Sequence, residues 1–143
     1  MIIRSARVLR WAEHAEVDLT RLEAAMAAWN ARCAWAFGST VRGDDTATSD
    51  IDIAVVVVPY GSGPTHPPAA FAVQARLPVE WHCWVDMSAF LRAEVAATGI
   101  VLWESVPGDA ARIEHEVLAE WQHGASARAQ RRAAELADAR PLT

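Results

Sequence analysis

Two carboxylates one residue apart, Asp50 and Asp52, stand at the start of residues 51–58, a run rich in β-branched side chains. Side chains alternate along a strand, so both carboxylates project from one face, about 7 Å apart. Such a pair can hold one or two hard cations such as Mg²⁺. A Gly-Ser step, Gly38-Ser39, precedes Asp50 by ten intervening residues and can offer backbone N–H groups to a phosphate. Together these residues predict metal-assisted phosphate chemistry.

A third acidic residue, Glu80, lies near the start of residues 78–85, which predict a further strand. In phosphoryl transfer, a third carboxylate can complete metal binding or accept the proton of the attacking hydroxyl group. Asp86 lies on the same strand face, but six strand residues span roughly 20 Å, so both cannot serve one metal cluster. We expect Glu80 to take the role. His82 also lies on that face, and we expect an ordinary half-buried histidine there.

The chain contains thirteen Arg and no Lys. The absence of Lys excludes a Schiff-base lysine and a Walker-type phosphate lysine. Backbone, Arg or metal must therefore hold any phosphate, and Arg42 either approaches a phosphate or pairs with a nearby Asp. The net charge of −5 argues against broad nucleic-acid binding, so nucleic acid is not an expected partner.

Two cysteines, Cys33 and Cys83, form no CxxC motif, and we expect buried thiols rather than a disulfide or a zinc site. The N-terminal residues lack the apolar region of a signal peptide. The longest apolar run, residues 53–58, is too short to span a bilayer. The expectation is a soluble cytoplasmic protein without a membrane partner.

The remaining elements predict an α/β fold: a small mixed β-sheet flanked by helices, in a single domain of residues 1–143. The core spans about residues 18–104, and a C-terminal helical segment spans about residues 108–140, interrupted at Gly124. Ser5, Asp18 or Thr20, and Ser88 are candidate helix caps. The sequence predicts strands at residues 32–37, 51–58, 78–85 and 100–103, and helices at residues 5–16, 19–29, 69–77 and 89–97. Residues 60–68 predict a loop, and Asp44 and Asp45 are expected to be solvated turn residues.

A resemblance to a known family rests on two strings, Gly38-Ser39-Thr40-Val41-Arg42-Gly43 and Ser49-Asp50-Ile51-Asp52-Ile53. They are similar to the motif of the DNA polymerase β-type nucleotidyltransferase superfamily, and most similar to its minimal nucleotidyltransferases. The order of elements between about residues 18 and 104 resembles the same domain. The resemblance implies a nucleotidyltransferase-like fold and Mg²⁺-dependent transfer of a nucleoside monophosphate, AMP from ATP, to a hydroxyl acceptor.

The resemblance also implies roles for individual residues. Gly38 and Ser39 would hold the nucleoside triphosphate, and Asp50 and Asp52 would bind one or two Mg²⁺ ions. Glu80 stands at the third acidic position, where many members of the family have Asp. That departure leaves the third role open.

The expectations differ in the acceptor to which the nucleotide is transferred. Related enzymes that modify aminoglycoside-type antibiotics usually carry an additional helical domain, and the segment after Pro107-Gly108 is short for one. Stand-alone antitoxins of this size pair with a helical HEPN-type toxin and transfer AMP to it. The apolar stripe of Ile113, Val117 and Trp121 could contact such a partner, although packing on its own sheet is the expected role. A homodimer is the other expected assembly. A non-catalytic nucleotide-binding or partner-binding module is the alternative.

Overall fold

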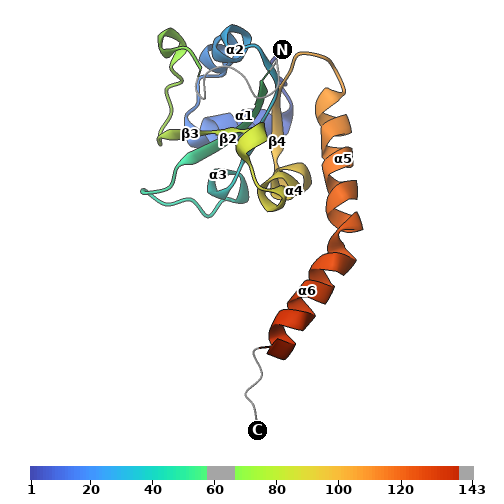
Figure 1. The fold of residues 1–143 in the computed structure, drawn as a ribbon. Helices are drawn as coiled ribbons and strands as arrows, with labels where there is room; N and C mark the ends of the chain where they lie inside the picture. Colours follow the sequence, from blue (N-terminus) through green and yellow to red (C-terminus); the bar gives the residue numbers. More distant parts are fainter. Residues whose placement is uncertain (58–66, 139–143) are drawn as a thin grey trace.

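The structure of the protein, a computed structural model, describes residues 1–57 and 67–138. Four strands form one sheet in the order β3-β2-β1-β4, with helices on both faces (Figure 1). The strands are β1 Ala31–Phe37, β2 Ile51–Val57, β3 Val79–Cys83 and β4 Ile100–Glu104. β1 pairs antiparallel with β2 and β4, whereas β2 pairs parallel with β3. The predicted α/β fold with a mixed sheet is confirmed.

Three helices begin at predicted caps. The Ser5 hydroxyl accepts a hydrogen bond from Val8 N, and the Asp18 carboxylate accepts from the N–H groups of Thr20 and Arg21. Ser88 caps a third helix by accepting from Leu91 N. Each cap satisfies N–H groups that have no partner within the helix. The helices are α1 Ala6–Ala15, α2 Leu19–Ala28, α3 Ser39–Arg42, α4 Ala89–Thr98, α5 Asp109–His123 and α6 Ala125–Asp138.

The sheet buries both faces. On one face, Ile51, Ile53 and Val55 pack with α1 and α2 in the larger hydrophobic cluster. On the other face, Ala54 and Val56 pack with β1 and with residues of α4 and α5. Burial on both sides explains why β2 is a nearly continuous apolar run and not an alternating one. Within residues 1–57 and 67–138, no helix has both the length and the apolar character needed to cross a membrane.

Two predicted elements are wrong in extent. The helix predicted at residues 69–77 is only a 3₁₀ helix at Ala69–Phe71, because the following backbone bonds elsewhere: Arg76 N donates to Ala15 O at 2.9 Å. The strand predicted at residues 78–85 ends at Cys83, because Trp84 turns into the core and stacks on Trp35 with a ring-centroid distance of 5.1 Å. Most of the predicted loop at residues 60–68 lies outside the described residues.

The C-terminal helices follow the expected break at Gly124, which ends α5. Ile113 is buried and Val117 packs beside it against the cluster under α4, the expected role of this stripe. Trp121 contacts Phe90 of α4 at 6.0 Å between ring centroids. α6 continues from α5 and leads away from the sheet (Figure 1).

The N-terminus of α5 is fixed to the sheet by Asp109. Its buried carboxylate accepts bidentate hydrogen bonds from the guanidinium of Arg32 on β1, and Arg112 donates to the same carboxylate at 2.9 Å. These bonds, that from Arg32 first, lower the pKa of Asp109 to about 2. The pair connects α5 to β1 across 77 residues of sequence.

Asp109→Asn is expected to lower the free energy of unfolding by about 1–2 kcal/mol at neutral pH, since charged hydrogen bonds are replaced by neutral ones. The folded-state pKa is below the unfolded value, so the contribution is present above about pH 4 and is lost as pH falls toward about 2. Urea unfolding of both proteins at several pH values measures the difference.

Glu116→Gln is the matched control, because Glu116 is exposed and pairs with the same Arg112 at 3.0 Å. Its effect should stay within about 0.5 kcal/mol. A difference between wild type and Asp109→Asn that persists undiminished at low pH would contradict the assignment.

Candidate active site

Asp52 on β2 lies directly opposite Glu80 on β3 in the parallel register. The Asp52 side chain is 22% exposed and the Glu80 side chain 54% exposed, so the first is held by its surroundings and the second reaches solvent. Within residues 1–57 and 67–138, Asp52, Glu80 and His82 have oxygen or nitrogen atoms within 4.8 Å of one another. Two carboxylates and an imidazole of this spacing can hold a divalent cation.

The other two predicted carboxylates lie outside this group. Asp50 is exposed and immediately precedes β2, which is anchored there by a hydrogen bond of 2.8 Å from Ile51 N to Pro78 O. Asp86 is exposed and lies in the 3₁₀ helix that follows β3. The structure therefore brings Glu80, and not Asp86, next to Asp52. A metal-binding role for Asp50 stays a prediction.

The Gly-Ser turn lies against Asp52. Gly38 has φ 80° and ψ −153°, and a Cβ at this position would lie 2.4 Å from Asp52 Oδ2. Only glycine lets the backbone come this close to the carboxylate. Half-buried Ser39 begins α3, and the first N–H groups of a helix have no helical partner to satisfy them. Buried Thr40 fixes this turn by accepting a hydrogen bond from Trp11 Nε1 of α1 at 3.2 Å.

Arg42 is engaged by acidic side chains. Its guanidinium donates to Asp44 Oδ2 at 3.3 Å and to Glu94 Oε1 of α4 at 3.2 Å. Of the two expected roles, the structure shows the pairing with a nearby Asp. Contact of Arg42 with a phosphate stays a prediction.

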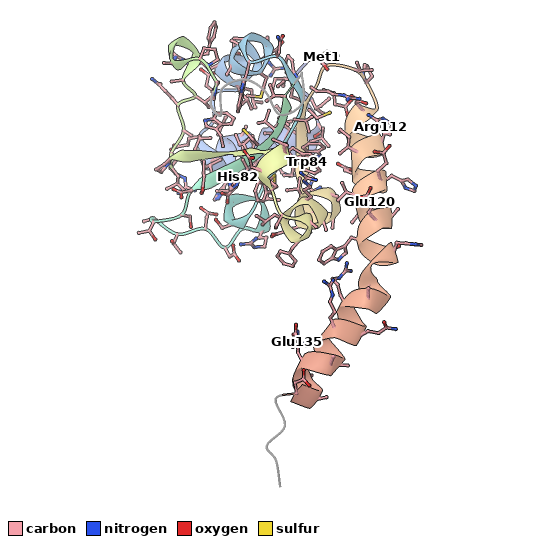
Figure 2. The ribbon with its side chains drawn as sticks, in the orientation of Figure 1. Met1, His82, Trp84, Arg112, Glu120 and Glu135 are labelled. Atoms are coloured by element: carbon pink, nitrogen blue, oxygen red, sulfur yellow. The ribbon has the colours of Figure 1, made fainter. Side chains whose placement is uncertain are left out.

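His82 has a more specific environment than its sequence position suggested. Its Nε2 lies 2.9 Å from Asp52 Oδ1, and its ring packs edge-on against Phe37 at 5.0 Å between centroids. Figure 2 labels His82 at the end of β3, next to Trp84, where the chain leaves the strand. The period-two alternation from Glu80 was the signal for this placement, because it puts both side chains on one face.

Asp45 corrects an expectation, since it is not a solvated turn residue. Its side chain is only 6% exposed and bonds with His14 Nε2 at 2.8 Å and with Arg76 at 2.7 Å. These hydrogen bonds, that of His14 first, lower the pKa of Asp45 to about 2. Asp45 thus ties the loop before β2 to α1 and to the segment before β3. Both partners are 31 residues away in sequence, so no local pattern could indicate them.

Cys33 carries a free thiol, as expected. Cys33 is buried, and burial raises the pKa of its thiol to about 12. Cys83 is half-buried on β3, and burial raises its pKa as well. Neither is suited to act as a nucleophile.

Comparison with known families decides the classification. Residues 22–105, more than half of the chain and all of the candidate site, match the family described as polymerase beta, nucleotidyltransferase. The chain belongs to this nucleotidyltransferase family. The resemblance in the Gly-Ser and Asp-x-Asp strings is thereby confirmed. No curated protein sequence matches the chain.

Several solved structures share the nucleotidyltransferase fold. A chain of a toxin–antitoxin crystal structure with AMP-PNP superposes with a TM-score of 0.61 at 19% identity, covering 82% of this chain and 98% of that chain. A chain of the MntA-HepT toxin–antitoxin crystal structure gives 0.54 at 18% identity, covering 82% and 96%. A chain of the complex of tri-AMPylated Shewanella oneidensis HEPN toxin with MNT antitoxin gives 0.54 at 18% identity, covering 90% and 98%. At these identities the similarity establishes the fold.

Proposed function

We propose that this nucleotidyltransferase-family protein transfers AMP from ATP to a hydroxyl group of a HEPN-type partner protein and releases pyrophosphate. The observation that carries the proposal is the juxtaposition of Asp52 and Glu80 across β2 and β3, with Gly38 against Asp52. Family membership supports the reaction class. The structural neighbours that contain AMP-PNP or an AMPylated HEPN toxin support the nucleotide and the partner.

The donor atoms fit a divalent cation. Asp52 and Glu80, with Asp50 two residues before Asp52, would hold one or two Mg²⁺ ions. Bound Mg²⁺ neutralises negative charge that spreads over the transferring phosphoryl group. The fit rests on carboxylate oxygens from two adjacent strands and on the close approach of the Gly38 backbone to the Asp52 carboxylate.

The residues of the chain then have distinct tasks. The backbone at Gly38 and Ser39 would bind the triphosphate, because N–H groups at the start of α3 attract anions. The acceptor hydroxyl oxygen forms a bond to the α-phosphorus, and the bond from that phosphorus to the oxygen bridging the β-phosphorus breaks. Pyrophosphate leaves with that oxygen. Glu80, the more exposed carboxylate, would accept the hydroxyl proton.

A second candidate function is binding without catalysis, in which the chain is an antitoxin that acts by covering its partner. The position of Asp50 outside the group of Asp52, Glu80 and His82, and a Glu at the third acidic position, favour this alternative. The two functions differ in whether label moves from nucleotide to partner.

The deciding experiment incubates the protein with a HEPN-type partner, Mg²⁺ and ATP labelled at the α-phosphate. We expect label on the partner, with the modified hydroxyl residue located by peptide mass spectrometry. ATP labelled at the γ-phosphate is the control, because its label should leave with pyrophosphate. A tight complex without label on either protein would support the binding function and contradict transfer.

A further inference from the structure

The imidazole of His82 lies inside the group of candidate metal ligands. β3 places Glu80 and His82 on one face, and the register sets them beside Asp52 and Ala54. His82 Nε2 is 2.9 Å from Asp52 Oδ1 and 3.9 Å from Glu80 Oε2. The ring is 21% exposed, which leaves it accessible to an ion from solvent. One nitrogen therefore faces two carboxylates of the site.

The surroundings hold this nitrogen in place. Phe37 packs edge-on against the imidazole at an interplanar angle of 64°, and Phe37 itself pairs with Asp52 in the sheet. Gly38 approaches Asp52 from the next position in the chain. A cavity of about 200 Å³ adjoins the ring and is lined by Trp81, His82, Cys83, Asp86, Met87 and Leu91. The ligand atoms are thus preorganised and reachable.

We propose that Asp52, Glu80 and His82 form a mixed carboxylate–imidazole site that binds a divalent first-row transition-metal ion in preference to Mg²⁺. Mg²⁺ is a hard cation that takes oxygen ligands and releases water reluctantly. Transition-metal ions gain more from an imidazole nitrogen, and they bind N/O sites in the order Mn²⁺, Fe²⁺, Co²⁺, with affinity rising. The nitrogen of His82 therefore shifts the selectivity of the site.

Calorimetric titration of the intact protein with Mn²⁺ alone and with Mg²⁺ alone tests the preference. Mn²⁺ should bind at least about 10-fold more tightly than Mg²⁺. His82→Gln should lower the Mn²⁺ affinity by about 10-fold or more and change the Mg²⁺ affinity little. His115→Gln is the control, because His115 is exposed on α5 and outside the candidate ligand group, and it should leave the Mn²⁺ affinity unchanged. Equal Mn²⁺ affinity in wild type and His82→Gln would overturn the proposal.

Two further measurements use the wild-type protein and therefore do not require a folded variant. The absorption spectrum of the wild-type protein with Co²⁺ should show nitrogen ligation. Mn²⁺ should also slow modification of His82 by diethylpyrocarbonate, measured by peptide mass spectrometry against exposed His115 on α5 as the internal reference. Mg²⁺ at the same concentration should protect His82 less. Unchanged modification of His82 in the presence of Mn²⁺ would contradict the proposal.

The inference deepens the proposed function by naming the metal class, and the two can fail separately. Transfer of AMP with Mg²⁺, together with no effect of His82→Gln on Mn²⁺ binding, would refute the metal preference and leave the transfer reaction standing. Tight Mn²⁺ binding through His82 without AMP transfer in either metal would refute the reaction and leave the site standing.

Discussion

Asp52→Asn is expected to lower the rate of AMP transfer by about 10³-fold or more. The carboxylate is the point where β2, Glu80 and the Gly-Ser turn meet, and losing its charge weakens metal binding. Metal stabilisation of the transferring phosphoryl group supplies several kcal/mol, and each 1.4 kcal/mol corresponds to about a tenfold change in rate. Single-turnover transfer from α-labelled ATP measures the effect. Asp50→Asn should also slow transfer, since Asp50, immediately before β2, is the second proposed ligand of the Asp-x-Asp motif.

Asp86→Asn is the control for these two variants. Asp86 is exposed and lies in the 3₁₀ helix beyond β3, outside the group of candidate ligands. Its replacement should leave the rate within a small factor of the wild-type rate. Undiminished transfer in Asp50→Asn and Asp52→Asn would show that the site assignment is wrong. A loss confined to Asp86→Asn would move the third carboxylate to that residue.

Gly38→Ala is expected to damage both stability and activity. An alanine at φ 80° and ψ −153° enters a backbone region that is open essentially to glycine alone, which costs about 1–3 kcal/mol of folding free energy. The new Cβ would also lie 2.4 Å from Asp52 Oδ2, so the carboxylate or the Gly-Ser turn must shift. Because a displacement of about 1 Å can cost 10²-fold in rate, we expect transfer to fall by at least about 10²-fold. Urea unfolding and single-turnover transfer measure the two effects.

Gly43→Ala separates the effect of backbone strain from the effect of a steric clash with Asp52. Gly43 ends α3 at φ 84° and ψ 14°, and nothing lies within 4 Å of a Cβ built there. Alanine in this left-handed conformation should cost about 1 kcal/mol of stability and leave the transfer rate near that of the wild type. Equal losses of activity in Gly38→Ala and Gly43→Ala would mean that the contact with Asp52 is not what limits the reaction.

Local patterns were sufficient to predict much of the fold. Ser5, Asp18 and Ser88 each cap a helix. These caps were predictable because the capping side chain bonds to a backbone N–H only two or three residues ahead, within the same local stretch of sequence. β2 was predictable because its β-branched run is buried on both faces. The helix predicted at residues 69–77 failed because helix propensity is weak, and bonding of Arg76 to α1 overrides it.

The candidate site was also predictable only in part, through spacing within the strands and not through contacts between separate elements. Spacing predicted that Asp50 and Asp52 share one strand face, and the strand after it offered Glu80. The structure brings Asp52 and Glu80 together, and the role of Asp50 stays a prediction. Alternation placed His82 on the strand face of Glu80, but its bond to Asp52 and the burial of Asp45 depend on contacts between separate elements, which no local pattern indicates. Trp84 illustrates the same limit: the predicted strand runs to residue 85, but packing of Trp84 on Trp35 ends the strand at Cys83, two residues earlier.

The junction at Asp45 bears on how a ligand would bind. The loop from α3 to β2 leads directly to Asp50, and Asp45 holds that loop to α1 and to the segment before β3. Ordering a free loop around a ligand costs conformational entropy at the moment of binding. Here folding has already restrained the loop, so the proposed nucleotide would meet a surface whose shape is set beforehand. The affinity of a ligand for such a surface then depends mainly on its contacts and little on the conformational entropy that binding removes.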